Sequence, residues 1–391
     1  MHTGDVLTAV RALVPALRER AGEAEACRRL PDSTVKELAG SGFFRLLQPR
    51  AYGGLAADPD TFHTVVEEIA KACGSTGWAA SVLALTPWHL ALFDARAQDE
   101  VWGAGADNSA LICSSYAPTG TVTRVTGGFR ISGRWHFSSG CDHAQWALLG
   151  GLVTDGDGRP VDMRTFLLPH SAYTVDDVWD TVGLRGTGSN DIVVDDAFIP
   201  EHRSLGYAPV TALACPGHEA HPDPLYRLPY AALFTTTIST SIVGIAQGAY
   251  EEHLAAARQR FRSAGGQQAA EDPFAQVRTA RAASEIDAAR LQLAHNMADM
   301  YATVRRGEGV SMDQRARARR DQVMATERAA IAVDLLVGNA GGGVMGQGGD
   351  VLQRAWRDVH TGRRQAANDV ERALTLFGQH VLGVEVHDTM V

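Results

Sequence analysis

The stretch WRDVHTGRRQAAND, residues 356–369, carries several side chains that could hold or move a proton. Its pattern predicts one continuous helix. His360 and Asp369 can each act as a general base, whereas Gln365 can hold a hydroxyl group but cannot accept its proton. Five helical residues rotate a side chain by roughly 140°, so we expect His360 and Gln365 on different faces. Asp369 shares the face of Gln365 and is a candidate base, with an exposed surface carboxylate as the alternative.

A second stretch, RWHFSSG, could bind a planar ring. The aromatic residues Trp135 and Phe137 stand beside the small residues Ser138 and Ser139. A strand that ends in small residues can approach a ring closely, and its hydroxyl groups and free backbone amides can bind ring heteroatoms. The alternative interpretation is a β-turn flanked by ordinary core aromatics.

Three other patterns predict no ligand site. Cys215, His218 and His221 have ligand-like spacing but no fourth soft ligand nearby, so we predict a solvated loop and no metal. GGGVMG, residues 341–346, matches the dinucleotide pattern but follows a long helix instead of a strand, which predicts a glycine-rich turn and no nicotinamide site. The basic run 315–320 predicts a solvated helix face instead of a phosphate site.

Three regions of different periodicity must position these groups. Residues 1–110 have apolar positions at helical spacing. Residues 111–225 contain short β-branched and aromatic runs, with a hairpin signal at Gly127-Gly128, and predict a small antiparallel β domain. Residues 226–391 return to long helical patterns that predict a bundle. The expected fold class is therefore α+β and mostly α, and a doubly wound α/β fold is excluded because its strands would alternate with helices.

Composition excludes several classes of partner. The net charge of −9 argues against nucleic acid, because phosphate binding needs a positive surface. The apolar stretch 78–93 contains Pro87 and His89 and is too short to cross a bilayer, so it predicts a buried helix pair. The five cysteines are scattered and odd in number, and the start of the chain lacks a secretory pattern. We therefore expect a cytoplasmic protein without a membrane partner.

Several long motifs, in one order along the chain, resemble the acyl-CoA dehydrogenase superfamily. They are GFFRLLQPRAYGG, GSTGWAASVLALTPWHLALF, SSYAPTG, SGRWHFSSGCDHAQWALLGG, VGLRGTGSNDIVVDDAFIPEHR and LQRAWRDVH. More narrowly, they resemble its two-component flavin-dependent monooxygenase (group D) branch, and within it the oxygenase components of 3-hydroxy-9,10-secoandrostatrienedione 4-hydroxylases. The similarity runs almost from end to end, including the terminal DTMV. It implies an N-terminal helical domain (1–110), a central β domain (111–225) and a C-terminal four-helix bundle (226–391).

The resemblance also implies a reaction. Such oxygenases receive reduced FMN or FAD from a separate flavin reductase, and O2 converts it to a C4a-hydroperoxyflavin that hydroxylates a small aromatic or phenolic molecule. The YEG-type carboxylate motif of true acyl-CoA dehydrogenases is missing, and WRDVHTG stands in its place. Relatives usually assemble into a homotetramer, in which arginines of one subunit reach the flavin of the next.

The site residues that the resemblance implies fall into three groups. In the family the two serines meet the N5 edge of the flavin ring, and the arginine of the R-x-x-F motif pairs with the flavin phosphate. The cofactor-binding group is Ser138, Ser139, Trp135, Phe137, Arg258 and Phe261. The substrate pocket group is Trp78, His89, Tyr116 and Gln365. The catalytic group is Gln365, His360, Ser139 and Asp369, with His360 expected on the flavin side or at the adjoining subunit.

One position departs from the family. Phenol-hydroxylating relatives carry a second histidine five residues after WRDxH, which faces the substrate hydroxyl and helps to remove its proton; here that position is Gln365. A phenol with a pKa of about 10 is ionised to only about one part in a thousand at pH 7, an equilibrium cost of about 4 kcal/mol. A base on the hydroxyl would relieve part of this cost, and glutamine cannot.

Four explanations stay open for Gln365. The substrate can be an acidic phenol or naphthol, or a base elsewhere can serve. The substrate can instead be an amine, a sulfide or an indole, so that the reaction is N- or S-oxygenation or attack on an indole carbon. The chain can have kept only a flavin oxidase or dehydrogenase role. Finally, it can be a silent, flavin-free subunit, against which the retained Ser138, Ser139 and Arg258 argue. We favour the first two, with an aromatic substrate.

Overall fold

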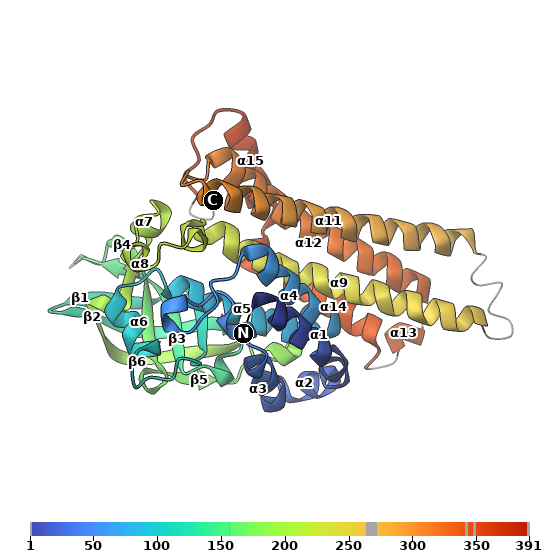
Figure 1. Cartoon of the computed structure of the whole chain (residues 1–391), viewed down its shortest axis with the longest axis horizontal. Helices are drawn as coiled ribbons and strands as arrows, with labels where there is room; N and C mark the ends of the chain where they lie inside the picture. Colours follow the sequence, from blue (N-terminus) through green and yellow to red (C-terminus); the bar gives the residue numbers. More distant parts are fainter. Residues whose placement is uncertain (1, 156, 263–271, 341–342, 347–348, 389–391) are drawn as a thin grey trace.

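A β-sheet lies at one end of the molecule and long helices extend from it to the other end (Figure 1). The computed structural model describes residues 2–155, 157–262, 272–340, 343–346 and 349–388. The N-terminal helices pack between these two parts, and α5 contacts both strand β1 and helix α9. The site residues of the middle and last regions therefore approach one another across α5.

The first region is helical, as predicted. Its helices are α1 (Thr3–Glu19), α2 (Ala21–Cys27), α3 (Asp32–Gly40), α4 (Pro59–Ala72), α5 (Gly74–Leu90) and α6 (Ala95–Trp102). Helix α4 begins with proline at its first position, and the Asp58 carboxylate accepts a hydrogen bond from the Thr61 backbone N–H at 2.8 Å. The first backbone N–H groups of a helix have no partner within the helix. Proline removes one of them, and the aspartate side chain accepts a hydrogen bond from another.

Helix α5 is buried along its whole length. The prediction of a helix pair in residues 78–93 was wrong, because the helix continues through Pro87. Proline removes the N–H that would bond to the carbonyl four residues earlier, which here is that of Leu83. The Thr86 hydroxyl donates to this carbonyl at 3.0 Å and to that of Ile112 at 2.7 Å. A side chain thus supplies the donor that proline lacks.

The middle region forms a seven-stranded sheet within the described part of the chain, with the order β5-β6-β2-β1-β3-β4-β7. Its strands are β1 (Ile112–Val125), β2 (Gly128–Ser138), β3 (Trp146–Thr154), β4 (Pro160–Pro169), β5 (Thr174–Asp176), β6 (Asn190–Pro200) and β7 (Ser204–Gly206). The predicted hairpin is confirmed, since Val125 pairs with Gly128 around a left-handed Gly127. Two short helices, α7 (Tyr207–Thr211) and α8 (Gly217–Ala220), follow the sheet.

One strand pair differs from the expected antiparallel arrangement. Strands β1 and β3 pair in parallel, while the other neighbouring pairs are antiparallel. Strand β3 runs opposite to β2 but joins the free edge of β1 instead of that of β2, so it must run parallel to β1. The alternation of apolar residues does not reveal which edge a strand joins.

The last region is a bundle of long helices (Figure 1). Its helices are α9 (Tyr230–Arg262), α11 (Pro273–Arg305), α12 (Met312–Ala340) and α14 (Val351–Gly362), with α15 (Val370–Val381) packed on α12. The stripe predicted from spacing is buried on α11 and comprises Ile286, Leu293, Met297, Met300 and Val304. Residues 343–346 form a short helix, α13, instead of a turn, and 341–342 lie outside the described residues. None of the described helices is long and apolar enough to span a membrane.

The predicted single helix over residues 356–369 was wrong. Helix α14 ends at Gly362, a turn follows, and a 3₁₀ helix, η8 (Ala366–Asn368), precedes α15. Side chains with amide or carboxylate groups break the pattern by bonding to the backbone: Asn368 donates to the Gly362 carbonyl at 2.9 Å, and Asp369 accepts from the Arg372 N–H at 3.0 Å. Such local bonds compete with helical ones.

Two apolar clusters share helix α5. The larger cluster joins the N-terminal helices to the sheet and includes Leu83 and Trp88. The other fills the bundle and includes Trp78 and Val82, together with Leu184 from the loop before β6. One helix therefore contributes to both cores, which fixes the sheet and the bundle relative to each other.

Candidate active site

Two buried serines, Ser139 and Ser189, and their neighbours form a hydrogen-bonded edge where β2 ends, here called the serine edge. The Ser139 hydroxyl accepts from the Trp78 indole N–H at 3.1 Å and lies 2.8 Å from the Ser189 hydroxyl. The Ser189 hydroxyl lies 2.7 Å from that of Thr187. These groups are neutral and buried, so the edge holds its shape through short bonds that need no counter-ion.

The backbone is irregular just before this edge. Phe137 has a φ of 64° and its side chain is 66% exposed, with its ring edge-on to that of Trp179 at 5.8 Å between centroids. The next residue, Ser138, is buried and donates its hydroxyl to the Ser114 carbonyl at 3.3 Å. An apolar ring is thus presented outward, beside small residues that face inward.

Trp135 does not lie at this edge. Its ring is buried in the core of the sheet, and its indole N–H donates to the Gly150 carbonyl at 2.7 Å. An ideal strand would place residues 135 and 137 on one face, but the pairing of β2 with β6 shifts between Trp135 and Ser138. The structure therefore does not support the prediction that Trp135 binds the cofactor.

Trp78 joins the serine edge to the turn after α14. A β-carbon built on Gly362 would lie 3.1 Å from the Trp78 ring and 3.2 Å from Ile242, so only glycine allows this approach without displacement. The Gly362 carbonyl accepts from the Gln365 N–H at 3.1 Å. The sequence-predicted residues Ser139, Trp78 and Gln365 are thereby brought into one connected set.

Gln365 is half-buried and begins η8. Its side-chain Oε1 accepts from the Ala367 N–H at 2.5 Å. The Gln365 side chain therefore holds the turn in place, which the sequence pattern did not indicate. Asp369 does not share its face, because the residues between them form the 3₁₀ helix η8 instead of a continued α-helix, and its exposed carboxylate caps α15. The structure gives Asp369 a structural role.

Four rings cluster where β1, α5 and the start of α9 meet. The His89 Nδ1 lies 3.0 Å from the Tyr116 hydroxyl, and the rings of His89 and Tyr230 are 4.7 Å apart. Phe234 stacks on Tyr230 at 5.6 Å and meets Tyr116 edge-on at 5.8 Å. Burial lowers the pKa of His89 to about 3, so its imidazole is neutral at pH 7. The cluster is an uncharged aromatic wall.

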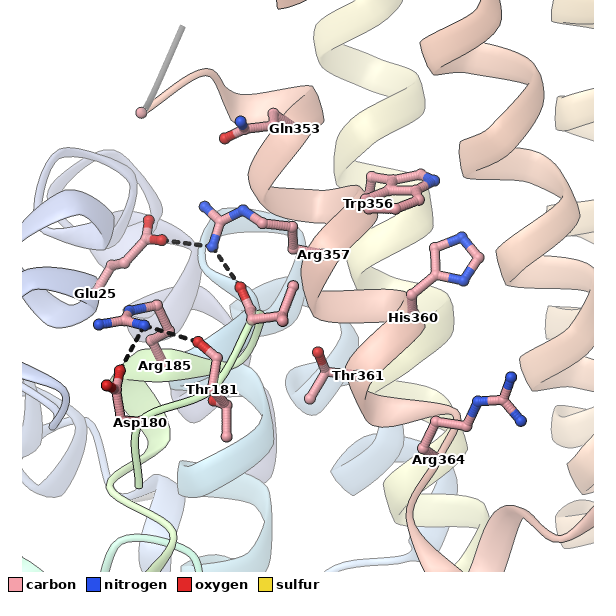
Figure 2. Close-up of a pocket in the computed structure, with 12 residues that line it drawn as sticks. Glu25, Asp180, Thr181, Arg185, Gln353, Trp356, Arg357, His360, Thr361 and Arg364 are labelled. Atoms are coloured by element: carbon pink, nitrogen blue, oxygen red, sulfur yellow. Dashed lines mark hydrogen bonds and ion pairs between the residues drawn. The ribbon is translucent and has the colours of Figure 1, made fainter. Parts of the chain in front are cut away.

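His360 lines a surface pocket of about 1040 Å³, and Gln365 is not among the residues that line it (Figure 2). Its Nε2 is 3.0 Å from the Asp334 carboxylate, which also accepts from the Trp356 indole N–H at 2.7 Å. Arg357 of the same helix lines the same pocket and contacts Glu25 of α2 at 2.6 Å (Figure 2). His360 and Gln365 thus have different partners, but the reason predicted, five residues of one helix, does not apply because α14 ends at Gly362.

Asp358 is a buried carboxylate that the sequence analysis did not single out. Its Oδ1 accepts from the Leu184 N–H at 2.6 Å, which ties α14 to the loop after Trp179. Burial raises the pKa of Asp358 to about 7. Its position within WRDVHTG was the available signal, but nothing in the spacing indicates that the backbone of residue 184 would reach it.

The basic run 315–320 is not uniformly solvated. Arg319 is only 3% exposed, and its Nη1 donates to the Gln322 Oε1 and to the Ala367 carbonyl. The prediction of a solvated face is therefore wrong for this residue. Its neighbour Arg317 agrees better with the prediction, since its half-exposed guanidinium pairs with Asp299.

The segment with Cys215, His218 and His221 is buried, so the prediction of a solvated loop was wrong. The His221 Nε2 lies 2.6 Å from the Gln98 Oε1, and the His218 Nε2 lies 2.8 Å from the Tyr226 carbonyl. These partners occupy the ring nitrogens that a metal would need. Among the described residues, no group of three or more histidine, cysteine, aspartate or glutamate side chains is placed to hold a metal ion.

Arg258 is exposed and belongs to the last turns of α9, which ends at Arg262. That end of α9 is remote from the sheet (Figure 1). This chain therefore does not bring Arg258 to its own serine edge. The side chain of Phe261 lies outside the described residues.

Comparisons with known proteins agree with this architecture. Residues 5–105 match the model of the acyl-CoA dehydrogenase N-terminal domain, and residues 236–369 match that of the acyl-CoA dehydrogenase C-terminal domain. The chain is 51% identical over 381 residues to the flavin-dependent monooxygenase oxygenase subunit HsaA of Rhodococcus jostii (strain RHA1), covering 97% of this chain and 99% of that protein.

Two solved structures are similar over nearly the whole chain. The 3-HSA hydroxylase from Rhodococcus sp. RHA1 has a TM-score of 0.96 at 50% identity, covering 99% of both chains. XiaF from Streptomyces sp., solved with FADH2 and glycerol, has a TM-score of 0.89 at 28% identity, covering 99% of this chain and 97% of XiaF.

The chain belongs to the acyl-CoA dehydrogenase family. Within that family it is an oxygenase component of the flavin-dependent monooxygenases, enzymes that act with reduced flavin and O2. These relatives are named as an oxygenase subunit or an oxygenase component, which implies that a separate reductase supplies the reduced flavin.

Proposed function

We propose that this oxygenase hydroxylates a phenolic ring at the carbon next to the hydroxyl group. The observation that carries the proposal is the uncharged aromatic wall of His89, Tyr116, Tyr230 and Phe234, which lies beside α5 and suits a flat apolar substrate. The similarity to a relative named 3-HSA hydroxylase supports a ring of this kind.

The residues present fit a flavin at the serine edge. Phe137 and Trp179 offer an apolar surface next to Ser138 and Ser139, which suits one side of a planar ring. The adjacent pocket is lined by Arg185, Arg357 and Arg364 and by two carboxylates, Asp180 and Glu25, which pair with Arg185 and Arg357 (Figure 2). Its lining is thus net positive, which suits the negatively charged end of the cofactor. Bound reduced flavin would supply the activated oxygen atom.

The protein would contribute shielding and orientation. Trp78 joins the serine edge to the turn, and α5 is buried along its whole length, so both would keep water away from a substrate held beside them. Gln365 would hold the substrate hydroxyl but could not take its proton. The tautomer of neutral His89 in its contact with Tyr116 decides which of the two rings donates, and both would orient a substrate without adding charge.

Assembly and supply of flavin belong to the same proposal. Because Arg258 lies far along the bundle from the serine edge of its own chain, it would reach a flavin phosphate only in another copy. This arrangement supports a homotetramer, in which each site is completed by a neighbouring chain. A flavin reductase would deliver reduced FMN or FAD, either in contact with the oxygenase or by diffusion.

A second candidate is N- or S-oxygenation of a non-phenolic substrate. The presence of Gln365 favours it, because attack by an amine nitrogen or a sulfur needs no phenolic proton to be removed.

A substrate screen separates the two candidates. The purified protein, reduced FMN from a generic flavin reductase and O2 are incubated with phenols, amines, indoles and sulfides, and products that have gained one oxygen atom are detected by mass. The proposal predicts catechols as the main products. Oxygenated amines or sulfides without any catechol would contradict it and favour the alternative.

A further inference from the structure

Arg319 is a buried cation with unused donors. Arg319 belongs to α12 and is 3% exposed, and of its guanidinium nitrogens only Nη1 is bonded, to Gln322 and Ala367. The Nε and Nη2 groups have no hydrogen-bond partner. A buried arginine normally meets a carboxylate, because an unpaired buried charge costs several kcal/mol.

The described part of the chain offers Arg319 no ion-pair partner. Two carboxylates act on Arg319 electrostatically without bonding to it: Asp388, which pairs with Arg372 at 2.5 Å, and Asp369, which caps α15. The positive charge of Arg372 also opposes that of Arg319. Burial lowers the pKa of Arg319 to about 10, so the guanidinium remains protonated at pH 7.

The position of Arg319 connects it to the candidate catalytic turn. The Ala367 carbonyl accepts from Arg319 at 2.5 Å, while the N–H of the same residue donates to the Gln365 side chain. Gln322 extends the network to Asn368 at 2.6 Å and to Ser239 of α9 at 2.7 Å. The unpaired donors thus belong to the same buried network as the turn that carries Gln365.

We infer that Arg319 is an anion-recognition group of the substrate site, and that it binds an anionic oxygen of the substrate beside η8. The inference rests on the proposed function for the place of the substrate. Two sources can supply the oxygen: the phenolate of the reacting ring or a carboxylate elsewhere on the substrate. In the first case the phenol releases its proton to water on binding, and Arg319 does electrostatically what a base at position 365 would do by accepting the proton.

Two probes test the inference: a phenol whose ionisation is visible by absorbance, and a carboxylate. The flavin-loaded protein is titrated with 4-nitrophenol, whose phenolate absorbs visible light, and separately with benzoate. Wild type is expected to lower the pKa of bound nitrophenol by about one to three units, as a nearby opposite charge does. Arg319→Met should abolish the shift and weaken binding at least tenfold, while Arg319→Lys should keep part of it.

Arg317→Met is the matched control, because this residue lies on the same helix but pairs with Asp299. It should leave both probes unaffected. Circular dichroism and flavin binding check that each variant is folded, and Arg319→Gln preserves a donor toward Ala367 if the methionine variant does not fold. Benzoate binding that depends on Arg319, without a nitrophenol shift, supports the anion site and identifies a carboxylate as its ligand.

The inference is overturned if neither probe binds wild type, or if both bind wild type and the Arg319 variants equally. These results are separable from failure of the proposed function. Catechol formation with no effect of Arg319 on either probe rejects the anion site alone. Probe binding that depends on Arg319, with no catechol from any phenol, rejects phenol hydroxylation alone.

Discussion

The serine edge and the turn around η8 differ in how their polar groups are satisfied. At the serine edge, Ser139, Ser189 and Thr187 bond to one another and to Trp78, and every one of these groups is neutral. Around η8, the charged Arg319 keeps two donors without partners. A satisfied neutral network needs no ligand to be stable, whereas an unsatisfied charged one does.

This difference indicates that the serine edge and the turn around η8 have separate roles. In the proposed function, the serine edge would be preorganised for the flavin that this class of oxygenase requires. The turn carries the departure at Gln365 together with the buried Arg319, so it is where we place substrate recognition. Changes on the turn should therefore alter what is oxygenated, and changes at the edge should alter how well the flavin is protected.

Gln365→His should have the largest effect. If the substrate is a weakly acidic phenol, an imidazole on the hydroxyl should raise the hydroxylation rate by about a hundredfold, the lower range for a general base. Product formed per reduced flavin is the measurement, with the rate of flavin binding as a control that should not change. An unchanged or lower yield would indicate that the substrate is not a phenol.

Asp358→Asn tests the tie between α14 and the loop that ends in Leu184. The folded-state pKa of Asp358, about 7, lies above its ordinary value, so the folded protein binds a proton that the unfolded chain releases. Wild type is therefore most stable, relative to this variant, near pH 4 and loses on the order of a few kcal/mol as the pH rises through 7.

The measurement for Asp358→Asn is urea unfolding at several pH values. Asp369→Asn serves as the control, because that carboxylate is exposed. A wild-type stability that rises with pH relative to Asp358→Asn would contradict the assigned sign.

Trp78→Phe should act on the serine edge. It removes the N–H bonded to Ser139 and part of the ring packed on Gly362, at a cost of about 2 kcal/mol in the free energy of unfolding. In rapid mixing of the reduced-flavin complex with O2, wild type should give a long-lived absorbing species before oxidised flavin appears, and the variant should shorten its lifetime.

Trp88→Phe is the matched control for this prediction. It lies on the same helix, ten residues after Trp78, and loses a comparable buried bond, from its indole N–H to the Leu225 carbonyl at 2.9 Å. It should lower stability without shortening the lifetime of the absorbing species. Equal effects of the two variants would remove Trp78 from the site.

His360→Ala should have the smallest effect. The pair with Asp334 is partly exposed, and such pairs contribute about 0–1 kcal/mol to stability. We expect little change in product yield and a small decrease in flavin affinity, measured by fluorescence titration. A loss of turnover as large as that expected for a catalytic base would contradict the separation of His360 from the turn.

Features set by local pattern were predictable from the sequence. The buried stripe on α11 follows from residue spacing alone, and the hairpin at Gly127 follows from the need for a left-handed residue in a tight turn. The motifs around Ser139 and Trp78 also indicated the site, and the structure joins them by a hydrogen bond.

Features set by distant partners were not predictable. Arg319 is buried because η8, 48 residues away in sequence, packs on it, and the basic run around it looks like a surface. Helix α14 ends early because the Asn368 side chain takes the Gly362 carbonyl. The side chains of Trp135 and Phe137 do not share a face because the pairing register of β2 with β6 shifts between Trp135 and Ser138. Each outcome depends on a contact that neither periodicity nor composition encodes.

The left-handed backbone of Phe137 should make the thermal stability of this protein depend on whether a flat ligand is bound over the Phe137 ring. A bulky residue at a φ of 64° costs about 1 kcal/mol or more, and the exposed ring recovers only part of that from its edge-on contact with Trp179. A flat surface laid over the ring would offset more of the cost. We therefore expect the sheet to melt at a higher temperature when a flat ligand covers it, and replacement of Phe137 by glycine to diminish that gain.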